Sequence, residues 1–442
     1  MTHRTPFPAL AAAAALVLVL GCEDDDEPEQ PSRAASAPAA EAPGAEAPGE
    51  PPVADAFPNG LAIAYAQFEV ENGRVTAKPG PARMELLHRK GGRWRTEVVE
   101  DPESNVFHKA MVYEPADGEP GILTLGGSEA AVKLWRRDGE EWKAETLWKD
   151  SFGGKFDRMR DAEVGDLYGD GKPTIAVGTH DQGVVAMLRP GDEWKVERID
   201  RQSDTFIHEI EIGDLNDDGT LEVYATPSEP NRLEAGAQSG QVVRYVPKEG
   251  TDRTTVAELG DRHAKEIFVG DVDGDGTDEL YVAVEALTDR NEDDKVEIVE
   301  PVEIRRYDAD TPADEGHVVA TLPDRFTRFL TTGDLDGDGK NEMVAAAFRS
   351  GVWLLSPGDD PNGKWKTENI DRNSSGFEHA AVIADLDGDG TDELYVAADE
   401  QGEVRRYTWR DGEMRREVIH RRPIPGAMMT FGLMPFPVAL LE

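Results

Sequence analysis

The strongest constraint on the fold is a short acidic motif that the chain repeats. Residues 270–285 read GDVDGDGTDELYVAVE, with acidic side chains at alternate positions, then a glycine and a run of β-branched and aromatic residues. Carboxylates that alternate in a tight loop supply the oxygen ligands that hard cations such as Ca²⁺ prefer. Gly276 permits the sharp turn, and the apolar run after Glu279 is typical of a strand. The motif therefore predicts a calcium loop that leads directly into a β-strand.

Four copies of the loop are complete enough to predict a calcium site each. The predicted ligands are Asp214, Asn216, Asp218 and Glu222 in the first copy, Asp271, Asp273, Asp275 and Glu279 in the second, Asp334, Asp336, Asp338 and Glu342 in the third, and Asp385, Asp387, Asp389 and Glu393 in the fourth. A fifth copy keeps Asp166 and Asp170 but has Tyr168 and Thr174 at ligand positions, so its metal binding stays open.

The spacing of these loops indicates a repeat architecture. Their first acidic residues lie 48, 57, 63 and 51 positions apart, which is typical of a propeller or solenoid. An EF-hand would need an acidic ligand at loop position 12 between helices, whereas the second copy has Val282 there, within a predicted strand. The loops resemble those of FG-GAP or VCBS repeats, and the resemblance spans roughly residues 57–435. It implies a calcium-bearing β-propeller.

Strand counting predicts the number of blades. A recognisable third strand occurs seven times, for example VEIRRYD at 302–308 and EVRRYTW at 403–409. Residues 61–98 lack a first strand, and residues 425–434 resemble a first strand with nothing after it. We therefore expect an all-β, seven-bladed β-propeller of four-stranded blades, closed by N- and C-terminal strands that share one blade. Trp94, Trp142, Trp194 and Trp365 recur at one position and are expected to pack between outer strands or adjacent blades, with sugar stacking as the alternative.

The start of the chain predicts a lipid anchor. Residues 1–21 have a short apolar stretch after Arg4, and Val19 to Cys22 resemble a bacterial lipobox with Cys22 as the lipidated residue. Residues 22–56 are acidic and rich in Pro and Ala, as expected for a disordered tether. The predicted organisation is thus a signal peptide (1–21), a tether (22–56) and a propeller (57–442). It implies a bacterial cell-envelope protein, with the outer membrane favoured.

The formal net charge of −42 argues against nucleic-acid binding. Counting six residues back from each loop start nevertheless finds a ring of basic-type residues at the inner strands. These candidate ligand-binding residues are His108, Arg160, His208, Lys265, Arg328 and His379. They predict an anionic ligand, bound more tightly at mildly acid pH if the histidines gain charge there. The alternative is that neighbouring acids such as Asp161, Glu209, Glu266 and Glu378 neutralise the ring.

No nucleophile elbow, phosphate loop or zinc helix is present, so no catalytic residue is named. The favoured function is a calcium-stabilised, non-enzymatic binding scaffold on the cell envelope, expected to be a monomer. Its expected partners are an anionic glycan, a carboxylate or a protein. The alternatives are a polysaccharide-degrading lyase or hydrolase, or an accessory subunit of an envelope complex.

Overall fold

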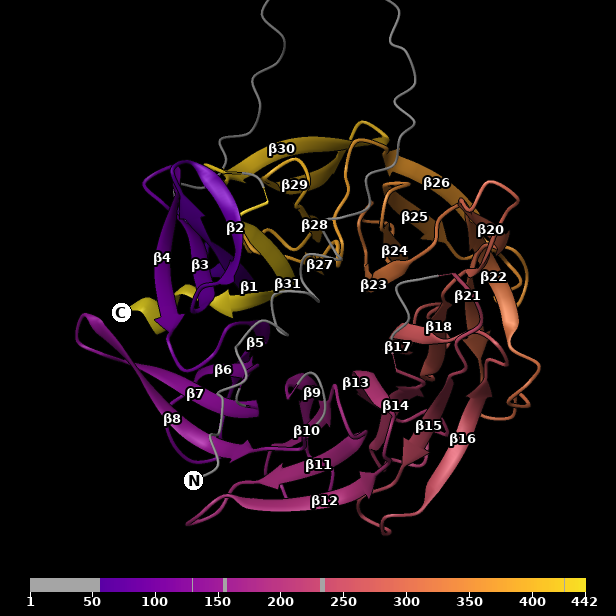
Figure 1. The fold of residues 1–442 in the computed structure, drawn as a ribbon, viewed down its shortest axis with the longest axis horizontal. Helices are drawn as coiled ribbons and strands as arrows, with labels where there is room; N and C mark the ends of the chain where they lie inside the picture. The colour runs from indigo at the N-terminus through magenta and orange to yellow at the C-terminus, as the bar shows by residue number, and fades with distance from the viewer. Residues whose placement is uncertain (1–55, 129, 154–156, 231–234, 425) are drawn as a thin grey trace, which may run out of the picture.

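Seven antiparallel sheets stand around a common axis in the computed structural model (Figure 1), which describes residues 56–442 except 129, 154–156, 231–234 and 425. Each sheet has four blade strands that run from the axis outward, and the sheet of blade 1 has β2 as a fifth strand, so the predicted seven-bladed β-propeller is confirmed. The signal peptide, Cys22 and all of the predicted tether except Ala56 lie outside the described residues. Within the described part of the chain, no helix is long and apolar enough to cross a membrane.

The strands follow the chain blade by blade. Blade 1 contains β31 (Met428–Pro437), β1 (Asn59–Glu71), β3 (Ala82–Lys90) and β4 (Arg93–Asp101). Blade 2 contains β5 (Phe107–Tyr113), β6 (Gly121–Gly126), β7 (Ala130–Asp138) and β8 (Glu141–Asp150). Blade 3 contains β9 (Met159–Gly165), β10 (Thr174–Thr179), β11 (Val184–Arg189) and β12 (Lys195–Arg201). Blade 4 contains β13 (Phe206–Gly213), β14 (Glu222–Ser228), β15 (Gln241–Tyr245) and β16 (Arg253–Glu258).

The remaining blades repeat the order. Blade 5 contains β17 (Ala264–Gly270), β18 (Glu279–Val284), β21 (Val302–Tyr307) and β22 (His317–Leu322). Blade 6 contains β23 (Thr327–Gly333), β24 (Glu342–Ala347), β25 (Val352–Ser356) and β26 (Lys366–Asp371). Blade 7 contains β27 (Ala381–Ala384), β28 (Glu393–Ala398), β29 (Glu403–Arg410) and β30 (Glu413–Arg421). A short 3₁₀ helix, η1 (Val438–Leu441), follows β31.

Blade 1 closes the ring as predicted. Its innermost strand, β31, comes from the C-terminal part of the chain and pairs with β1 from Asn59↔Pro437 to Gln67↔Met428. This pairing joins the two ends of the propeller in one sheet. It leaves no free sheet edge of the kind that a linear array of blades would expose.

The hydrophobic core lies between the blades. Seven clusters of buried apolar residues are present, and each joins two neighbouring blades, as when Tyr281 of blade 5 packs with Trp365 of blade 6. The recurring tryptophans belong to these layers. Trp194 lies 5.6 Å from Tyr113 of the preceding blade, and Trp365 lies 5.5 Å from Tyr281, measured between ring centroids. Their expected packing role is confirmed.

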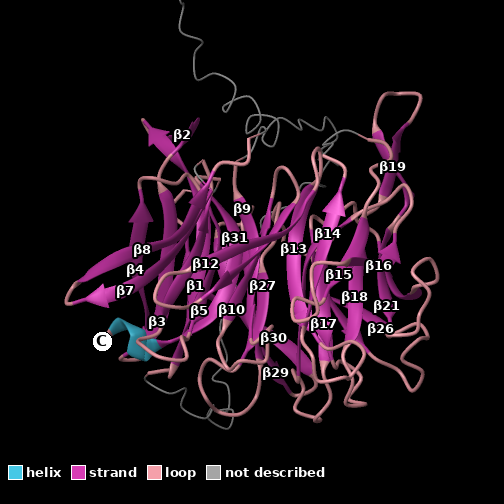
Figure 2. Ribbon diagram, turned by 90° about the horizontal axis from the view of Figure 1, so that it is seen from below, coloured by secondary structure: helices cyan, strands magenta, loops and turns pink. Residues whose placement is uncertain are grey.

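Two hairpins project beyond the blades on the same face of the ring (Figure 2). One extends β1 and includes β2 (Arg74–Pro79), and the other consists of β19 (Leu287–Arg290) and β20 (Val296–Glu300). Both lie in connections between the second and third strands of a blade. That end of a blade is also where the innermost strand begins, so the hairpins rise around the end of the axis that carries the predicted basic ring.

Candidate functional site

The acidic loops join the first and second strands of blades 4 to 7. In the Asp271 loop (residues 271–279), the Asp271 carboxylate accepts hydrogen bonds from the backbone N–H groups of Gly274 (2.7 Å), Asp275 (3.1 Å) and Gly276 (3.0 Å). Gly276 adopts a φ of 96°, which explains the glycine in the motif. The Asp214, Asp334 and Asp385 loops (residues 214–222, 334–342 and 385–393) fold the chain around their first aspartate in the same way.

The donor set fits a hard cation. In the Asp271 loop, one oxygen from each of the four predicted acids lies within 4.8 Å of the others, and three acids meet this criterion in the Asp334 and Asp385 loops. Asp338 and Asp389 fall outside these groups, and the Asp214 loop has Asn216 in place of one acid. Burial raises the pKa of Glu279, Glu342 and Glu393 to about 7. A divalent cation would offset this crowding of carboxylates.

Sequence reasoning missed a cation that reaches three of these loops from the third strand. Arg306 Nη2 on β21 lies 2.9 Å from Asp273 Oδ2 and 3.1 Å from Glu279 Oε1. Arg406 on β29 makes the same two ion pairs, with Asp387 and Glu393. Arg244 on β15 pairs with Glu222 at 2.9 Å. The signal was an arginine before the tyrosine in three of the third-strand copies.

The fifth loop, which contains Asp166 and Asp170, differs because the Arg189 guanidinium lies beside the positions that lack acidic ligands. Arg189 Nη2 donates to Asp170 Oδ2 at 2.9 Å, and the guanidinium carbon lies 3.8 Å from the centroid of the Tyr168 ring. Thr174 is buried, and its hydroxyl makes no hydrogen bond within the described residues. This arrangement satisfies Asp170 without a metal.

The loops also connect neighbouring blades. The residue before the last acid of one loop bonds to the first residue of the preceding loop: Asp278 accepts from the Asp214 N–H at 2.8 Å, and Asp392 accepts from the Asp334 N–H at 3.1 Å. Asn341 likewise donates to the Asp271 carbonyl at 3.2 Å. Fixing the conformation of one loop therefore also fixes the first residue of the preceding loop.

At the opposite end of the inner strands, five of the six predicted ring residues are buried near the axis. His108, Arg160, His208, Lys265 and Arg328 are between 2% and 8% exposed. The carboxylates of Glu285 and Glu378 neutralise part of their charge, and sequence analysis did not predict that these two acids act together. These seven side chains form what we call the channel mouth: His108, Arg160, His208, Lys265, Glu285, Arg328 and Glu378.

The two acids bridge several blades. Glu378 lies 3.4 Å from Arg160 and 3.4 Å from Arg328, so one side chain from blade 7 connects blades 3 and 6. Glu285 lies 2.9 Å from Arg328, 2.8 Å from His263 and 3.9 Å from Lys265. The predicted neutralisation by neighbours therefore holds for Glu378. Asp161 and Glu266 instead accept backbone N–H groups of the next blade, from Ile210 (2.9 Å) and Leu330 (2.8 Å).

Polar atoms remain unsatisfied at the mouth. Within the described residues, the Arg328 Nη2 donor and both carboxylate oxygens of Glu285 are buried and have no hydrogen-bond partner. His108 Nδ1 donates to the Met159 carbonyl at 3.0 Å, so its unpartnered Nε2 is an acceptor. Three cations, Arg160, Lys265 and Arg328, face two carboxylates, and Arg158 and Asp181 add one charge of each sign. Burial and the nearby Arg328 lower the pKa of Lys265 to about 8. Counted over its own charged side chains, the mouth carries one net positive charge, while Glu209 and Glu266 lie close enough to interact with Arg160.

The histidines do not supply the expected charge. Burial, followed by nearby cations, lowers the pKa of His108 and His208 well below the usual value, and burial also lowers the pKa of His379. His108 and His208 therefore stay neutral at mildly acid pH and do not supply the charge on which the expectation of tighter binding there rested. A charged imidazole would lose its hydration in this setting, which the sequence spacing could not reveal.

His379 also differs from the other ring residues in its contacts. It is fully buried, with Nδ1 2.5 Å from the Ala347 carbonyl oxygen and Nε2 2.7 Å from Ser374 Oγ. It adopts a φ of 55° just before β27, and the preceding Glu378 reaches the axis in its place. The structure thus assigns His379 to the support of the inner strand.

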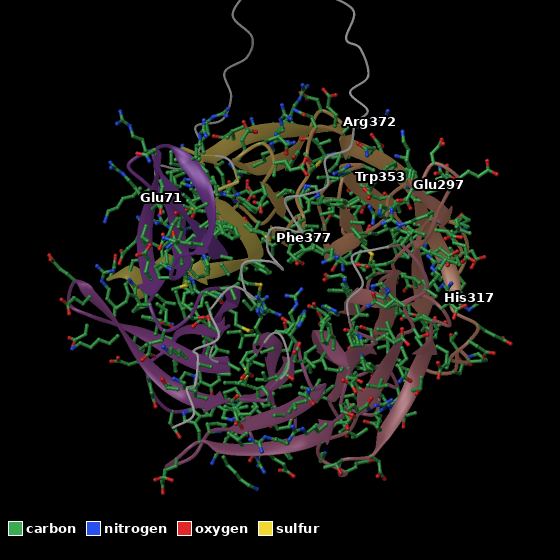
Figure 3. All side chains as sticks on the ribbon, in the orientation of Figure 1. Glu71, Glu297, His317, Trp353, Arg372 and Phe377 are labelled. Atoms are coloured by element: carbon green, nitrogen blue, oxygen red, sulfur yellow. The ribbon has the colours of Figure 1, made fainter. Side chains whose placement is uncertain are left out.

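Aromatic rings and a small pocket border the mouth. The Arg328 guanidinium carbon lies 4.9 Å from the Phe326 ring centroid and 4.7 Å from that of Phe377, which Figure 3 shows beside the middle of the ring. The pocket is lined in part by His263, Thr288, Arg325 and Phe326, so it shares residues with the surroundings of Glu285 and Arg328. A ligand at the mouth would meet both cationic donors and aromatic faces.

Comparisons with known proteins agree with this architecture. Residues 334–396 match the FG-GAP-like repeat family. Among curated protein sequences, none matches the chain. A solved structure of a Lactobacillus plantarum protein is similar with a TM-score of 0.54 and 10% identity, covering 85% of this chain and 99% of that one. The periplasmic gluconolactonase PpgL of Pseudomonas aeruginosa is similar with a TM-score of 0.51 and 11% identity, covering 84% and 98%.

A lectin from Agrocybe aegerita that recognises non-reducing terminal N-acetylglucosamine has a TM-score of 0.45 and 14% identity, covering 84% of this chain and 92% of that one. For the two structures with TM-scores above 0.5, the likeness at these identities concerns the fold. The chain is a seven-bladed β-propeller that carries an FG-GAP-like repeat in its sixth and seventh blades.

Proposed function

We propose that this protein is a calcium-stabilised binding scaffold whose channel mouth takes a carboxylate-bearing ligand, such as an acidic sugar of a glycan. The observation that carries the proposal is Arg328. Arg328 is 5% exposed, yet its Nη2 has no hydrogen-bond partner within the described residues, and its Nε contact with Glu285 lacks hydrogen-bond geometry. A buried unsatisfied donor is costly, and an anion would satisfy it.

The charge distribution supports an anion at this place. The chain carries a formal charge of −42, so the acidic surface repels anions in general. At the mouth, Arg160 and Lys265 join Arg328 in surroundings that exclude most water, which strengthens their field along the axis. The Phe326 and Phe377 faces beside Arg328 suit the apolar face of a sugar ring. Selectivity for anions would thus be local to the channel.

Calcium in this proposal is structural. The Asp271, Asp334 and Asp385 loops gather their acids at one end of the inner strands, while the mouth lies at the other. Since neighbouring loops are hydrogen-bonded to one another, metal binding would stiffen blades 4 to 7 and fix the inner strands that present Lys265 and Arg328.

A calorimetric titration tests the ligand class. D-glucuronate and D-glucose differ mainly in one carboxylate, so binding of the first and not the second to the calcium-loaded protein is expected. Arg160→Ala combined with Arg328→Ala should abolish the difference. The control, Arg415→Ala with Arg421→Ala, removes the same charge from exposed positions on β30 and should bind as the wild type does. Equal binding of both sugars, or no loss in the mouth variant, would overturn the proposal.

We propose further that Cys22 anchors the propeller to the bacterial cell envelope, with residues 22–56 as a spacer and the outer membrane as the favoured location. The support is the apolar stretch and lipobox at residues 9–22. Cys22→Ser should prevent labelling with a radioactive fatty acid and release the protein into the soluble fraction. Unchanged membrane association of this variant would mean that another anchor exists.

A polysaccharide-degrading enzyme is the second candidate, because one pair in the pocket could move a proton. His263 lines the pocket, and its Nε2 lies 2.8 Å from Glu285, which is 1% exposed. The contact lacks hydrogen-bond geometry in this structure, and the imidazole would act as a general base once a bound substrate aligned the pair. Polyuronate chains incubated with the protein should then shorten, and His263→Ala should stop the shortening. Intact chains in the wild-type reaction would argue for the scaffold.

A further inference from the structure

The four predicted calcium loops differ in one residue of the third strand. In blade 5, Tyr281 on β18 pairs in register with Arg306 on β21, and in blade 7, Tyr395 pairs with Arg406. Blade 4 repeats this with Tyr224 and Arg244. In each case the tyrosine hydroxyl and the guanidinium both contact the last acid of the loop. A polar network therefore surrounds that acid in three blades.

Blade 6 has apolar residues at the same two register positions. Val344 on β24 pairs with Leu354 on β25, so neither a hydroxyl nor a guanidinium reaches Glu342. Glu342 accepts a backbone N–H from Leu335 at 3.2 Å and is 7% exposed. Lys340, the basic residue within this loop, has an exposed side chain and makes no ion pair within the described part of the chain.

The third position of the loop shows the consequence. Asp273 and Asp387 are partly covered, with side chains 10% and 12% exposed, because an arginine lies against each of them. The equivalent Asp336 is exposed and has no cationic partner within the described residues. Its carboxylate oxygen nevertheless lies within 4.8 Å of those of Asp334 and Glu342. This group combines the metal-ligand arrangement with no built-in counter-charge.

A fixed guanidinium in contact with predicted ligands, two of them in blades 5 and 7 and one in blade 4, opposes a divalent cation at the same loop. It repels the ion and occupies oxygen lone pairs that the ion would use. The same guanidinium holds the acids together when no metal is bound, so such a loop depends less on calcium. A loop without the arginine gains more from the metal, because no cationic side chain among the described residues pairs with its acids.

We propose that the Asp334 loop is the high-affinity calcium site, and that Arg244, Arg306 and Arg406 weaken the other three loops. The calcium requirement of the ring is then concentrated in blade 6, between two blades that hold their loops with arginine. This inference rests on the proposed function only in assuming that the loops bind calcium.

Two opposite substitutions test it. Leu354→Arg places a guanidinium at the blade 6 position, and Arg306→Leu removes the one in blade 5. The control is Arg305→Leu, which deletes the same charge one residue earlier on β21, where the side chain pairs with Glu303 at 2.6 Å and not with the loop. Calcium affinity is measured for each protein by isothermal titration, with terbium luminescence as a second readout.

The wild type should bind one calcium ion at least tenfold more tightly than the others. Leu354→Arg should weaken that step at least tenfold, Arg306→Leu should create a second tight site, and Arg305→Leu should change neither. If Leu354→Arg fails to fold, Arg306→Leu still decides the question. Four sites of equal affinity, or an unchanged Arg306→Leu titration, would overturn this inference alone. No calcium binding by any loop would overturn the structural role of calcium as well.

Discussion

Replacing Glu378 with glutamine removes one negative charge from the channel mouth and keeps the size of the side chain. Glu378 is 4% exposed and lies 3.4 Å from both Arg160 and Arg328. With an effective dielectric constant of about 20, each pair at this distance is worth about 5 kcal/mol before desolvation is subtracted. Because removing one partner leaves buried cations uncompensated, we expect the free energy of unfolding to fall by about 3 kcal/mol.

The same substitution should improve anion binding. The mouth of Glu378→Gln has one more net positive charge, so D-glucuronate should bind roughly fivefold more tightly and restore part of the lost stability. Urea unfolding with and without glucuronate measures both effects. Glu413→Gln is the control, since Glu413 pairs with Arg415 at an exposed site and should change stability by less than about 0.5 kcal/mol. Unchanged stability together with unchanged affinity would refute this account of the mouth.

Three further predictions concern the loops and Lys265. Chelation with EDTA should lower the melting temperature, since each calcium site at 100 times its Kd contributes about 2.7 kcal/mol, and an unchanged melt would rule out structural calcium. Asp392→Ala should cost about 1 kcal/mol by removing the 3.1 Å hydrogen bond to the Asp334 N–H, whereas Asp192→Ala, at an exposed turn between β11 and β12, should cost little. The pKa of Lys265 is lowered to about 8 from 10.5, so between these pH values the unfolded chain binds a proton that the native protein does not. The stability of the wild type relative to Lys265→Met should therefore rise across that range by up to about 3 kcal/mol, and a flat profile would contradict the shift.

The repeat could be predicted from sequence because its signals are local. The acidic loop, the following strand and the third-strand motif each occupy a few residues, and their recurrence determined the blade count and the closure by β31 and β1. The tryptophans were placed correctly for the same reason. The pairing of β19 with β20 could not be predicted in the same way, because each of these strands is only four or five residues long.

The mouth could be predicted only in part, because its chemistry depends on contacts across the ring. The spacing of the repeats identified Arg160, Lys265 and Arg328. It could not show that Glu378 contacts Arg160, because these two residues are 218 positions apart in the sequence. Burial, which makes the histidines neutral, is a property of the closed ring. Arg244, Arg306 and Arg406 were visible in the sequence, but only the pairing of β-strands shows that they point to the acidic loops.

Anomalous diffraction from a crystal soaked in bromide tests the central claim most directly, because it locates an anion without assuming which ligand is native. The account predicts a bromide peak at the channel mouth within contact distance of Arg328 Nη2, and its loss when Arg160→Ala is combined with Arg328→Ala. A map with bromide bound elsewhere on the propeller and none at the mouth would contradict it.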